Sequence, residues 1–582
     1  MRDTWIGEIG EATAGRVVEV SGWVERRRDH GGLLFWDVRD RTGKLQVVFT
    51  PETGAVMEAA AAVRVESAVS VRGTVVRRGP GLENPKLATG TVELRAQALT
   101  VEGPAEVLPI DPMDPEVDEA LRLRYRYLDL RRRSLQSNLR VRHRMALCAR
   151  NFLDAQGFVE VETPTLARST PEGARDFLVP SRLSRGAFYA LPQSPQIFKQ
   201  LLMVAGMERY FQLARAYRDE DLRADRQPEF TQIDIEASFV DREYILDLTE
   251  RLLAEMFRNE GFEVPLPFPR LTHAEALDRY GTDKPDLRFD LPIADLDPWA
   301  DACGVEIFTR ARRAGGVVRC LRLPRSLSRR ELAETEEAAQ GLGLPGLGSL
   351  EVGESADRGP IARHLRPQVR DRLLELTGAG VGDTLLFAAG ERPVVCRALG
   401  ALRLRFGQLL ELVPPDRHAF AFVVDFPLFE LDENGQPTPS HHPFTAPHPE
   451  DRSRMAEDPL HVRSLAYDAV LDGVELASGS IRIHQRDVQE EVFRILGMSP
   501  AEAQSKFGFL LDAFRYGPPP HGGIALGFDR MVMLATGAPN IREVLAFPKN
   551  ARGYDPMMGS PAPVDPAQLR ELGIQVTVAP RG

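Results

Sequence analysis

The stretch that most constrains the fold is residues 208–239, which reads as two strands joined by a highly charged loop. Apolar and polar residues alternate in the second strand, which places Ile233, Ile235, Ala237 and Phe239 on one face. The connecting loop, residues 219–229, has eleven residues, seven of them charged, and is far longer than a tight hairpin turn. The pair therefore predicts one face against a core and one polar face. That polar face is either solvated or a site for a zwitterionic or phosphorylated ligand.

The composition is that of a multidomain globular protein. At 582 residues the chain is too long for one domain, and it has no run of about 18 apolar residues, so no membrane span is expected. The N-terminus lacks the apolar core of a signal peptide. The four cysteines show no Cys-x-x-Cys spacing, which argues against zinc ribbons and a disulfide framework and favours the cytoplasm. Because the net charge is −11, any nucleic-acid binding must rest on local basic patches.

Residues 1–107 predict an OB-type barrel. Five short strands are expected at 17–24, 33–39, 45–49, 68–76 and 91–99, with a helix near 57–65 between the third and fourth. The arginines at 26–28 could contact phosphates, Phe35 or Trp36 could stack on a base, and Gln46 could read a base edge. The alternative is a solvated hairpin end and aromatic residues that belong to the core.

After the barrel, a basic segment at 122–133 holds six arginines and is either a solvated helix or a surface close to phosphate. A helix at 135–156 and a strand at 158–162 follow. A Gly/Pro-rich α+β region interrupts the site-like motifs, with strands expected at 316–323, 384–388 and 394–398. The predicted domains are a barrel (1–107), a hinge (108–134), a first catalytic part (135–287), an inserted α+β domain (288–417), a second catalytic part (418–557) and a C-terminal extension (558–582).

Chemistry-bearing residues concentrate in the last part of the chain. A glycine-rich strand delivers Arg530 to a helix start, which is typical of a phosphate site, and Asp468 and Glu475 suit Mg²⁺. Glu475 and Arg482 differ by an odd number, so an unbroken strand would place them on opposite faces; we expect a bulge at 478–480. The histidines at 441, 442 and 448 lack zinc-site spacing and favour a histidine pair beside a carboxylate ligand instead.

Taken together, these motifs resemble those of class II aminoacyl-tRNA synthetases. The helix and strand that end at Pro164, the Arg218-Asp219-Glu220 loop and the helix start at Arg530 look like motifs 1, 2 and 3. The barrel resembles that of the aspartyl, asparaginyl and lysyl group. The chain resembles bacterial-type aspartyl-tRNA synthetases most closely. The resemblance lies in the inserted α+β region and in five stretches: STPEGARDF, LPQSPQIFKQ, RDEDLRADRQPEFTQ, HHPFT and GSIRIH. The resemblance implies a multidomain fold with an OB-type barrel, an antiparallel synthetase sheet with flanking helices and an inserted α+β domain.

The resemblance also implies roles for individual residues. It assigns catalysis to Arg218, Arg530 and Glu475, and magnesium to Asp468 and Glu475. Lys199 and Arg482 would hold the side-chain carboxylate of aspartate, with Asp234 bracing Lys199. The implied aspartate-binding residues are Glu172, Gln196, Lys199, Arg218, Asp234, His441 and Arg482. The implied ATP-binding residues are Arg218, Asp219, Glu220, Gln227, Phe230, Glu475, Gly527, Phe528, Asp529 and Arg530.

The partners implied are ATP, Mg²⁺, L-aspartate, tRNA(Asp) and a second copy of the chain. The anticodon would meet Arg28, His30, Phe35, Gln46 and Glu93. Enzymes strict for tRNA(Asp) tend to have leucine at the position of His30, so a relaxed enzyme that also charges tRNA(Asn) is an alternative. A lysyl enzyme would need acids where Lys199 and Arg482 stand. A decayed, non-catalytic RNA-binding relative is disfavoured by the intact Arg218, Glu475 and Arg530.

Overall fold

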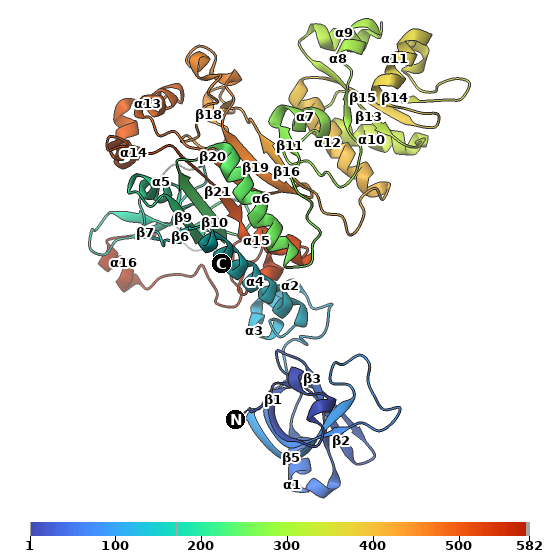
Figure 1. Ribbon diagram of the computed structural model, residues 1–582, viewed down its shortest axis with the longest axis vertical. Coiled ribbons are helices and arrows are strands. Elements are labelled where there is room, and N and C mark those ends of the chain that lie inside the picture. Colours follow the sequence, from blue (N-terminus) through green and yellow to red (C-terminus); the bar gives the residue numbers. More distant parts are fainter. Residues whose placement is uncertain (1, 170–172, 578–582) are drawn as a thin grey trace. The chain divides into compact units, whose positions relative to one another are not determined.

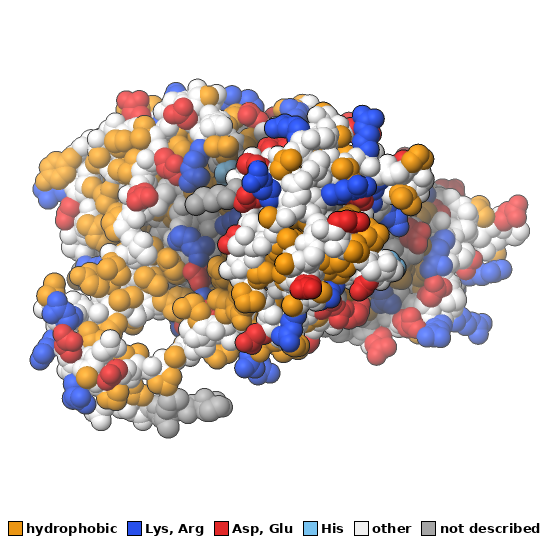
Figure 2. All heavy atoms as spheres, turned by 90° about the horizontal axis from the view of Figure 1, so that it is seen from below, with side chains coloured by type: hydrophobic (Ala, Val, Ile, Leu, Met, Phe, Trp, Pro, Cys, Tyr) orange, Lys and Arg blue, Asp and Glu red, His pale blue; other side chains and the backbone are white. Residues whose placement is uncertain are grey.

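The computed structural model describes residues 2–169 and 173–577, and divides the chain into two compact units, Met1–Leu121 and Arg122–Gly582. None of the helices in these ranges has the length and apolar character needed to span a bilayer. On the face drawn in Figure 2, basic and acidic side chains are interspersed among apolar ones.

The first unit is a closed five-stranded barrel, as predicted. Its order is β1-β2-β3-β5-β4, with β1 Val17–His30, β2 Leu33–Arg39, β3 Lys44–Phe49, β4 Ala68–Arg77 and β5 Val92–Gly103, and α1 Ala55–Ala62 lies between β3 and β4. Close strand contact requires glycine at position 73, where a Cβ would lie 2.1 Å from the carbonyl oxygen of Arg95. Trp36 packs against Phe49 in the core with ring centroids 4.6 Å apart, so it is not available to stack on a base.

The second unit is built on an eight-stranded sheet (Figure 1). Its order is β11 Arg270–Thr272, β16 Phe420–Val424, β19 Ala466–Leu471, β20 Val474–Ile481, β21 His521–Gly527, β10 Glu229–Ser238, β9 Arg209–Tyr217 and β6 Val159–Glu160. The six central strands are antiparallel, and the edge strands β11 and β6 run parallel to their neighbours. The expected pair of strands at 208–239 is thus β9 and β10, near one edge of the sheet.

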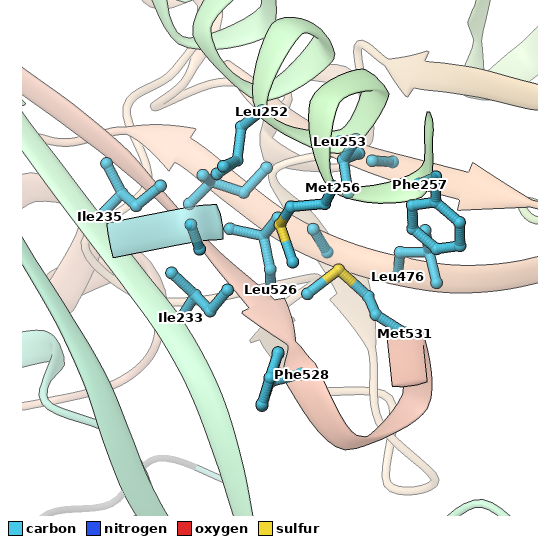
Figure 3. Close-up of a cluster of buried hydrophobic side chains, with 14 of the residues drawn as sticks. Ile233, Ile235, Leu252, Leu253, Met256, Phe257, Leu476, Leu526, Phe528 and Met531 are labelled. Atoms are coloured by element: carbon cyan, nitrogen blue, oxygen red, sulfur yellow. The ribbon is translucent and has the colours of Figure 1, made fainter. Parts of the chain in front are cut away.

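One face of this sheet is covered by α4 Arg133–Ala155, α6 Arg242–Arg258 and α15 Phe528–Thr536. Figure 3 shows Ile233 and Ile235 of β10 packed with Leu252 and Met256 of α6 in the resulting core. This is the apolar face predicted from the alternation, with one exception. Phe239 is 70% exposed and has a φ of +58°, because the strand ends at Ser238 and the chain turns away.

The inserted domain has its own four-stranded sheet and two cores. The order is β12 Ile293–Asp295, β13 Val317–Leu323, β15 Thr384–Gly390 and β14 Gly348–Glu351. Helices α10 Arg329–Gly341 and α12 Arg392–Leu409 cover one face; α8 Asp297–Ala302, α9 Glu306–Arg313 and α11 Pro367–Thr377 cover the other. The strand expected at 394–398 is wrong: this segment is the first part of α12, which begins with a proline in its first turn. Its β-branched residues favoured a strand, but they pack as one helix face.

The arginines at 122, 126 and 132 were expected to be solvated on a helix or to lie close to phosphate, but they form buried ion pairs instead. Asp129, which is 0% exposed, pairs with Arg122 at 2.9 Å and with Arg132 at 2.6 Å, and Arg126 also binds it. Arg126 in addition donates to the backbone carbonyl of Ala546 at 2.9 Å. These arginines therefore serve packing within the second unit, which contains α3 Arg126–Asp129.

The remaining helices and strands belong to the second unit, except that α2 begins at the end of the first. They are α2 Glu119–Arg124, β7 Leu178–Pro180, β8 Phe188–Ala190, α5 Gln196–Val204, α7 His273–Tyr280, β17 Phe429–Leu431, β18 Pro437–Pro439, α13 Arg486–Ile495, α14 Pro500–Ala513 and α16 Pro566–Leu572.

Candidate active site

The open face of the eight-stranded sheet holds a cavity of about 900 Å³. It brings together residues from α5, the loop between β9 and β10, strand β10, the β19–β20 hairpin and the start of α15. The sequence-predicted residues that line it are Gln196, Lys199, Arg218, Glu220, Gln227, Phe230, Asp234, His441, Asp468, Glu475, Arg482, Gly527, Asp529 and Arg530. Residues separated by more than 300 positions therefore share one site.

Three predicted residues are not among those that line the cavity. Glu172 lies outside the described residues. Asp219 pairs through its backbone N–H with the carbonyl of Arg175 at 3.0 Å. The side chain of Phe528 is in the core, 2% exposed, with the guanidinium of Arg142 4.8 Å above its ring, so only its backbone can serve a ligand.

Four buried charges form the floor of the cavity. Lys199 Nζ lies 3.0 Å from Asp234 Oδ1 and 3.4 Å from Glu236 Oε2. Arg482 contacts both oxygens of Glu236, at 3.0 and 3.2 Å, and its Nη1 donates to Ser480 Oγ at 2.7 Å. No member of the group is more than 5% exposed. Because burial of an unpaired charge is costly, each charge is held by a partner of opposite sign.

The two carboxyls of this group have different electrostatic surroundings. Burial alone would raise the pKa of Glu236, but Arg482 and Lys199 together lower it, so Glu236 is a carboxylate. Burial raises the pKa of Asp234 despite Lys199. Its Oδ2 is buried and makes no hydrogen bond within the described part of the chain. One carboxylate oxygen of Asp234, on the cavity floor, is therefore buried without a hydrogen-bond donor among the described residues.

A β-bulge explains how Glu475 and Arg482 reach the same cavity. In the β19–β20 pair, Ala469 is opposite Ala477 and Val470 is opposite Glu475, so Leu476 is the extra residue. The bulge expected at 478–480 is therefore wrong in position, since those residues pair regularly with β21. Its predicted consequence holds, because one extra residue restores the even spacing that places both side chains in the cavity.

At the other end of the cavity, cationic and aromatic side chains gather around the charged loop. The guanidinium of Arg218 lies 5.0 Å from the ring centroid of Phe230. Arg530 donates to the carbonyl oxygen of Glu475 at 2.6 Å and to Asp225 at 2.9 Å. The amide of Gln227 exchanges two hydrogen bonds with the backbone of Lys549, at 3.1 and 2.9 Å, which fixes the loop.

The carboxylates of Asp468 and Glu475 lie between the two ends. Asp468 Oδ1 is buried without a hydrogen bond in the described residues, at 3.4 Å from Nε2 of His441. Burial would lower the pKa of His441, but Asp468 raises it overall. Lys284 Nζ lies 3.1 Å from Glu475 Oε2. The described residues contain no cluster of three or more His, Cys, Asp or Glu side chains arranged as a metal site.

Sequence reasoning missed several residues of the site. Glu236 is one of them, and its only signal in the sequence is the alternation that puts it on the same face of the strand as Asp234. Asp225 and Lys284 gave no signal, because charged residues in loops are usually solvated. His442, which the sequence did predict as part of a histidine pair, lines the cavity next to His441, and its burial, together with Arg482 and Lys199, lowers its pKa to about 3.

In the barrel, the five candidate RNA-binding residues lie on β1, β2, β3 and β5. Arg28 pairs with Asp37 at 2.8 Å, and Gln46 donates to Glu93 at 3.0 Å. The rings of His30 and Phe35 are 6.2 Å apart. Arg28 and Phe35 are directly opposite in the β1–β2 pair, so a cation and a half-buried aromatic ring lie side by side.

Residues 118–551 match a family described as tRNA synthetases class II (D, K and N). The chain belongs to this family. Residues 18–102 match the OB-fold nucleic acid binding domain. Both matches confirm the class II synthetase resemblance and the predicted fold.

Relatives of this class II synthetase cover nearly its whole length. A protein of Moorella thermoacetica named Aspartate--tRNA(Asp/Asn) ligase is 53% identical over 576 residues, which are 98% of this chain and 96% of the relative. One of Symbiobacterium thermophilum with the same name is 50% identical over 591 residues, covering 99% and 100%. Among solved structures, asparaginyl-tRNA synthetase from Pyrococcus horikoshii with asparaginyl-adenylate has a TM-score of 0.60 at 20% identity, covering 94% of this chain and 98% of that one. That likeness supports the fold.

Proposed function

We propose that this class II synthetase is an aspartate–tRNA ligase, which activates L-aspartate with ATP and transfers it to the 3′-terminal ribose of tRNA(Asp) in the cytoplasm. The observation that carries the proposal is the buried pair of cations, Lys199 and Arg482, in a cavity that also holds Arg218 and Arg530. The names of the relatives, which match nearly the whole chain, support it.

Aspartate recognition follows from the charges on the floor. The side-chain carboxylate of the substrate would lie between Lys199 and Arg482, which Asp234 and Glu236 hold in place. The substrate ammonium would donate to the unpaired Oδ2 of Asp234, to Gln196 and to Glu172. Asparagine would bring a neutral amide to a position that faces two cations, and a site built for a charge rejects a neutral isostere strongly.

ATP would occupy the opposite end. Phe230 offers a ring face to adenine, Glu220 and Gln227 offer polar contacts, and Arg530 is a cation for the γ-phosphate. The α-carboxylate of aspartate attacks the α-phosphorus, the bond to the β-phosphate oxygen breaks, and aspartyl-adenylate and pyrophosphate form. Arg218 stabilises the charge that develops on the α-phosphate. The reaction needs no protein nucleophile, because positioning and charge stabilisation suffice.

Asp468 and Glu475 fit magnesium. Both present carboxylate oxygens to the cavity, and Asp468 Oδ1 has no hydrogen bond in the described chain. Bound Mg²⁺ would neutralise charge on the phosphate oxygens. His441, beside Asp468, would orient that carboxylate and lie next to the substrate.

The test is aspartate-dependent exchange of labelled pyrophosphate into ATP by the full-length protein. Exchange with aspartate and none with asparagine or lysine is expected. Pyrophosphate exchange that depends on lysine or asparagine but not on aspartate would contradict the proposal. An Arg530→Ala variant tests whether the cavity is catalytic. If ATP turnover by the variant equals that of the parent protein, the result favours a purely RNA-binding role instead.

A second candidate is a relaxed enzyme that also charges tRNA(Asn). His30 at the β1–β2 turn and the printed names of the relatives favour it. Charging of separated tRNA(Asp) and tRNA(Asn) transcripts decides between the two. If His30 confers the relaxed specificity, His30→Leu reduces charging of tRNA(Asn) while that of tRNA(Asp) is retained.

We also infer a homodimer through the face that carries α4 and β6. Leu147 of α4 and Val159 of β6, which belong to the helix and strand that resemble motif 1, are each 48% exposed and could be covered by a second copy. Sedimentation at micromolar concentration tests this, and a monomer contradicts it.

A further inference from the structure

The segment of residues 281–291, which connects α7 to the inserted domain, passes along the wall of the ATP end of the cavity. Asp283 and Lys284 both line the cavity. Lys284 Nζ is 3.1 Å from Glu475 Oε2. Because the lysine side chain is 44% exposed, its ammonium can also reach an anion that enters the cavity. None of the motifs described above includes this lysine.

The inserted domain holds this segment in place through α12. Arg403, which is 1% exposed, donates to three backbone carbonyls of the segment: those of Asp286 at 2.8 Å, Phe289 at 3.0 Å and Leu291 at 3.0 Å. Its guanidinium also lies 4.1 Å from the ring centroid of Phe289 and 4.9 Å from that of Tyr280. One buried arginine of the insertion thus fixes the backbone on the C-terminal side of Lys284.

The N-terminal side of the segment is fixed by a close backbone contact with the same helix. Gly281 has a φ of +71°, and a Cβ there would lie 2.2 Å from the carbonyl oxygen of Cys396 and 2.6 Å from the Cα of Gly400. The segment also touches the β19–β20 turn, where a Cβ on Gly473 would be 3.2 Å from that of Asp286. Both flanks of Lys284 are therefore anchored, to α12 and to the hairpin that carries Glu475.

We propose that Lys284 binds the polyphosphate of ATP and the pyrophosphate product, and that α12 of the inserted domain fixes the backbone that presents it. The proposal rests on the proposed function for the location of the phosphates. In the ligand-free protein the ammonium is paired with Glu475. A divalent cation held by Glu475 would compete with the ammonium for that carboxylate, and oxygens of the β- and γ-phosphates would then offer the ammonium an anionic partner.

The first test compares ligands with and without the polyphosphate, by calorimetry on the full-length protein with magnesium present. Lys284→Met removes the charge and keeps the stem. It should weaken ATP and pyrophosphate binding about tenfold or more, and leave AMP binding within about twofold, because AMP lacks the β- and γ-phosphates. Lys284→Arg should retain most of the affinity. Lys506→Met on α14, an exposed lysine that does not line the cavity, is the matched control.

A second readout does not involve nucleotide. Titration with Mn²⁺ alone, followed by electron paramagnetic resonance, should show tighter binding to Lys284→Met than to the parent protein, because the lysine no longer competes for Glu475. For the role of α12, Arg403→Gln should weaken ATP and pyrophosphate more than AMP. Arg405→Gln, a partly exposed arginine on the same helix, should not.

The proposal fails if Lys284→Met binds ATP and pyrophosphate as the parent does, or if AMP binding falls by the same factor as ATP binding. If Arg403→Gln unfolds, as circular dichroism would show, the Lys284 variants still decide the binding role. A protein that binds ATP more tightly than AMP but shows no aspartate-dependent exchange would sink the proposed function and leave this inference standing.

Discussion

Arg482 binds Glu236 through two parallel contacts, Nε to Oε1 at 3.0 Å and Nη2 to Oε2 at 3.2 Å, in a place where neither residue is more than 5% exposed. Glu236 also contacts Lys199 at 3.4 Å, so one carboxylate holds both cations that face the proposed substrate.

Replacing this carboxylate should therefore affect both folding and substrate binding. Glu236→Gln leaves two buried cations with one anion, and we expect a loss of about 3 kcal/mol in unfolding free energy together with a raised KM for aspartate. Calorimetry and pyrophosphate exchange measure the two effects. Glu229→Gln on the same strand removes a paired but 33% exposed carboxylate and should cost under about 1 kcal/mol. Equal losses for the two variants would contradict the argument.

Lys199 provides a test of substrate selection. Lys199→Met keeps the stem but removes the ammonium, and kcat/KM for aspartate should fall about 100-fold, because a buried charge-assisted contact is lost. The KM for ATP should change little, since ATP would bind at the opposite end of the cavity. Exchange kinetics with each substrate varied in turn provide the measurement. A comparable rise in both KM values would show a general disruption instead.

His442 predicts a pH dependence of stability. Its pKa is lowered from 6.5 to about 3 in the folded protein, by burial and then by Arg482 and Lys199. Between these values the unfolded chain holds a proton that the folded one does not, so stability falls as pH falls below about 6.5. From pH 7.5 to 5.0 this group contributes a loss of roughly 2 kcal/mol, at about 1.4 kcal/mol per unit.

The measurement is the thermal unfolding midpoint of the parent and of His442→Gln at both pH values. The variant should show a smaller decrease on acidification, whatever its absolute midpoint. His143→Gln on α4, an exposed histidine, should leave the decrease unchanged. A His442→Gln variant with the parent's full pH dependence would mean that the imidazole is not kept neutral by its surroundings.

The barrel can be tested separately from the catalytic cavity. Phe35→Ala removes a ring that would stack on an anticodon base, and the KM for tRNA should rise about tenfold. Pyrophosphate exchange, which needs no tRNA, should be unchanged. Arg77→Ala removes an exposed arginine of β4 that pairs only loosely with Glu11, at 3.7 Å, and serves as a control. An equal effect of the two variants would indicate a nonspecific electrostatic role.

The sequence predicted the five barrel strands because turn signals separate them and burial alternates over the first residues of β1, β2, β3 and β5, although β1 continues past its predicted end to His30. It also predicted which residues share the cavity, through recognisable motifs. It placed the bulge wrongly because glycine at 479 suggested irregularity, whereas that glycine allows close strand contact: a Cβ there would lie 2.3 Å from the carbonyl oxygen of Gly523. It missed Lys284 because its place beside Glu475 depends on long-range contacts of the flanking residues with α12, which no local pattern encodes.

The extra residue at Leu476 has a genetic consequence. Glu475 and Arg482 are an odd number of positions apart along the chain. Because of the extra residue in the strand, both side chains nevertheless lie on the same face of the sheet. Loss or gain of a single codon between positions 475 and 482 would leave both residues in the protein and change the strand by only one residue. It would nevertheless turn one of them toward the hydrophobic core, so this part of the gene tolerates substitutions far better than changes in length.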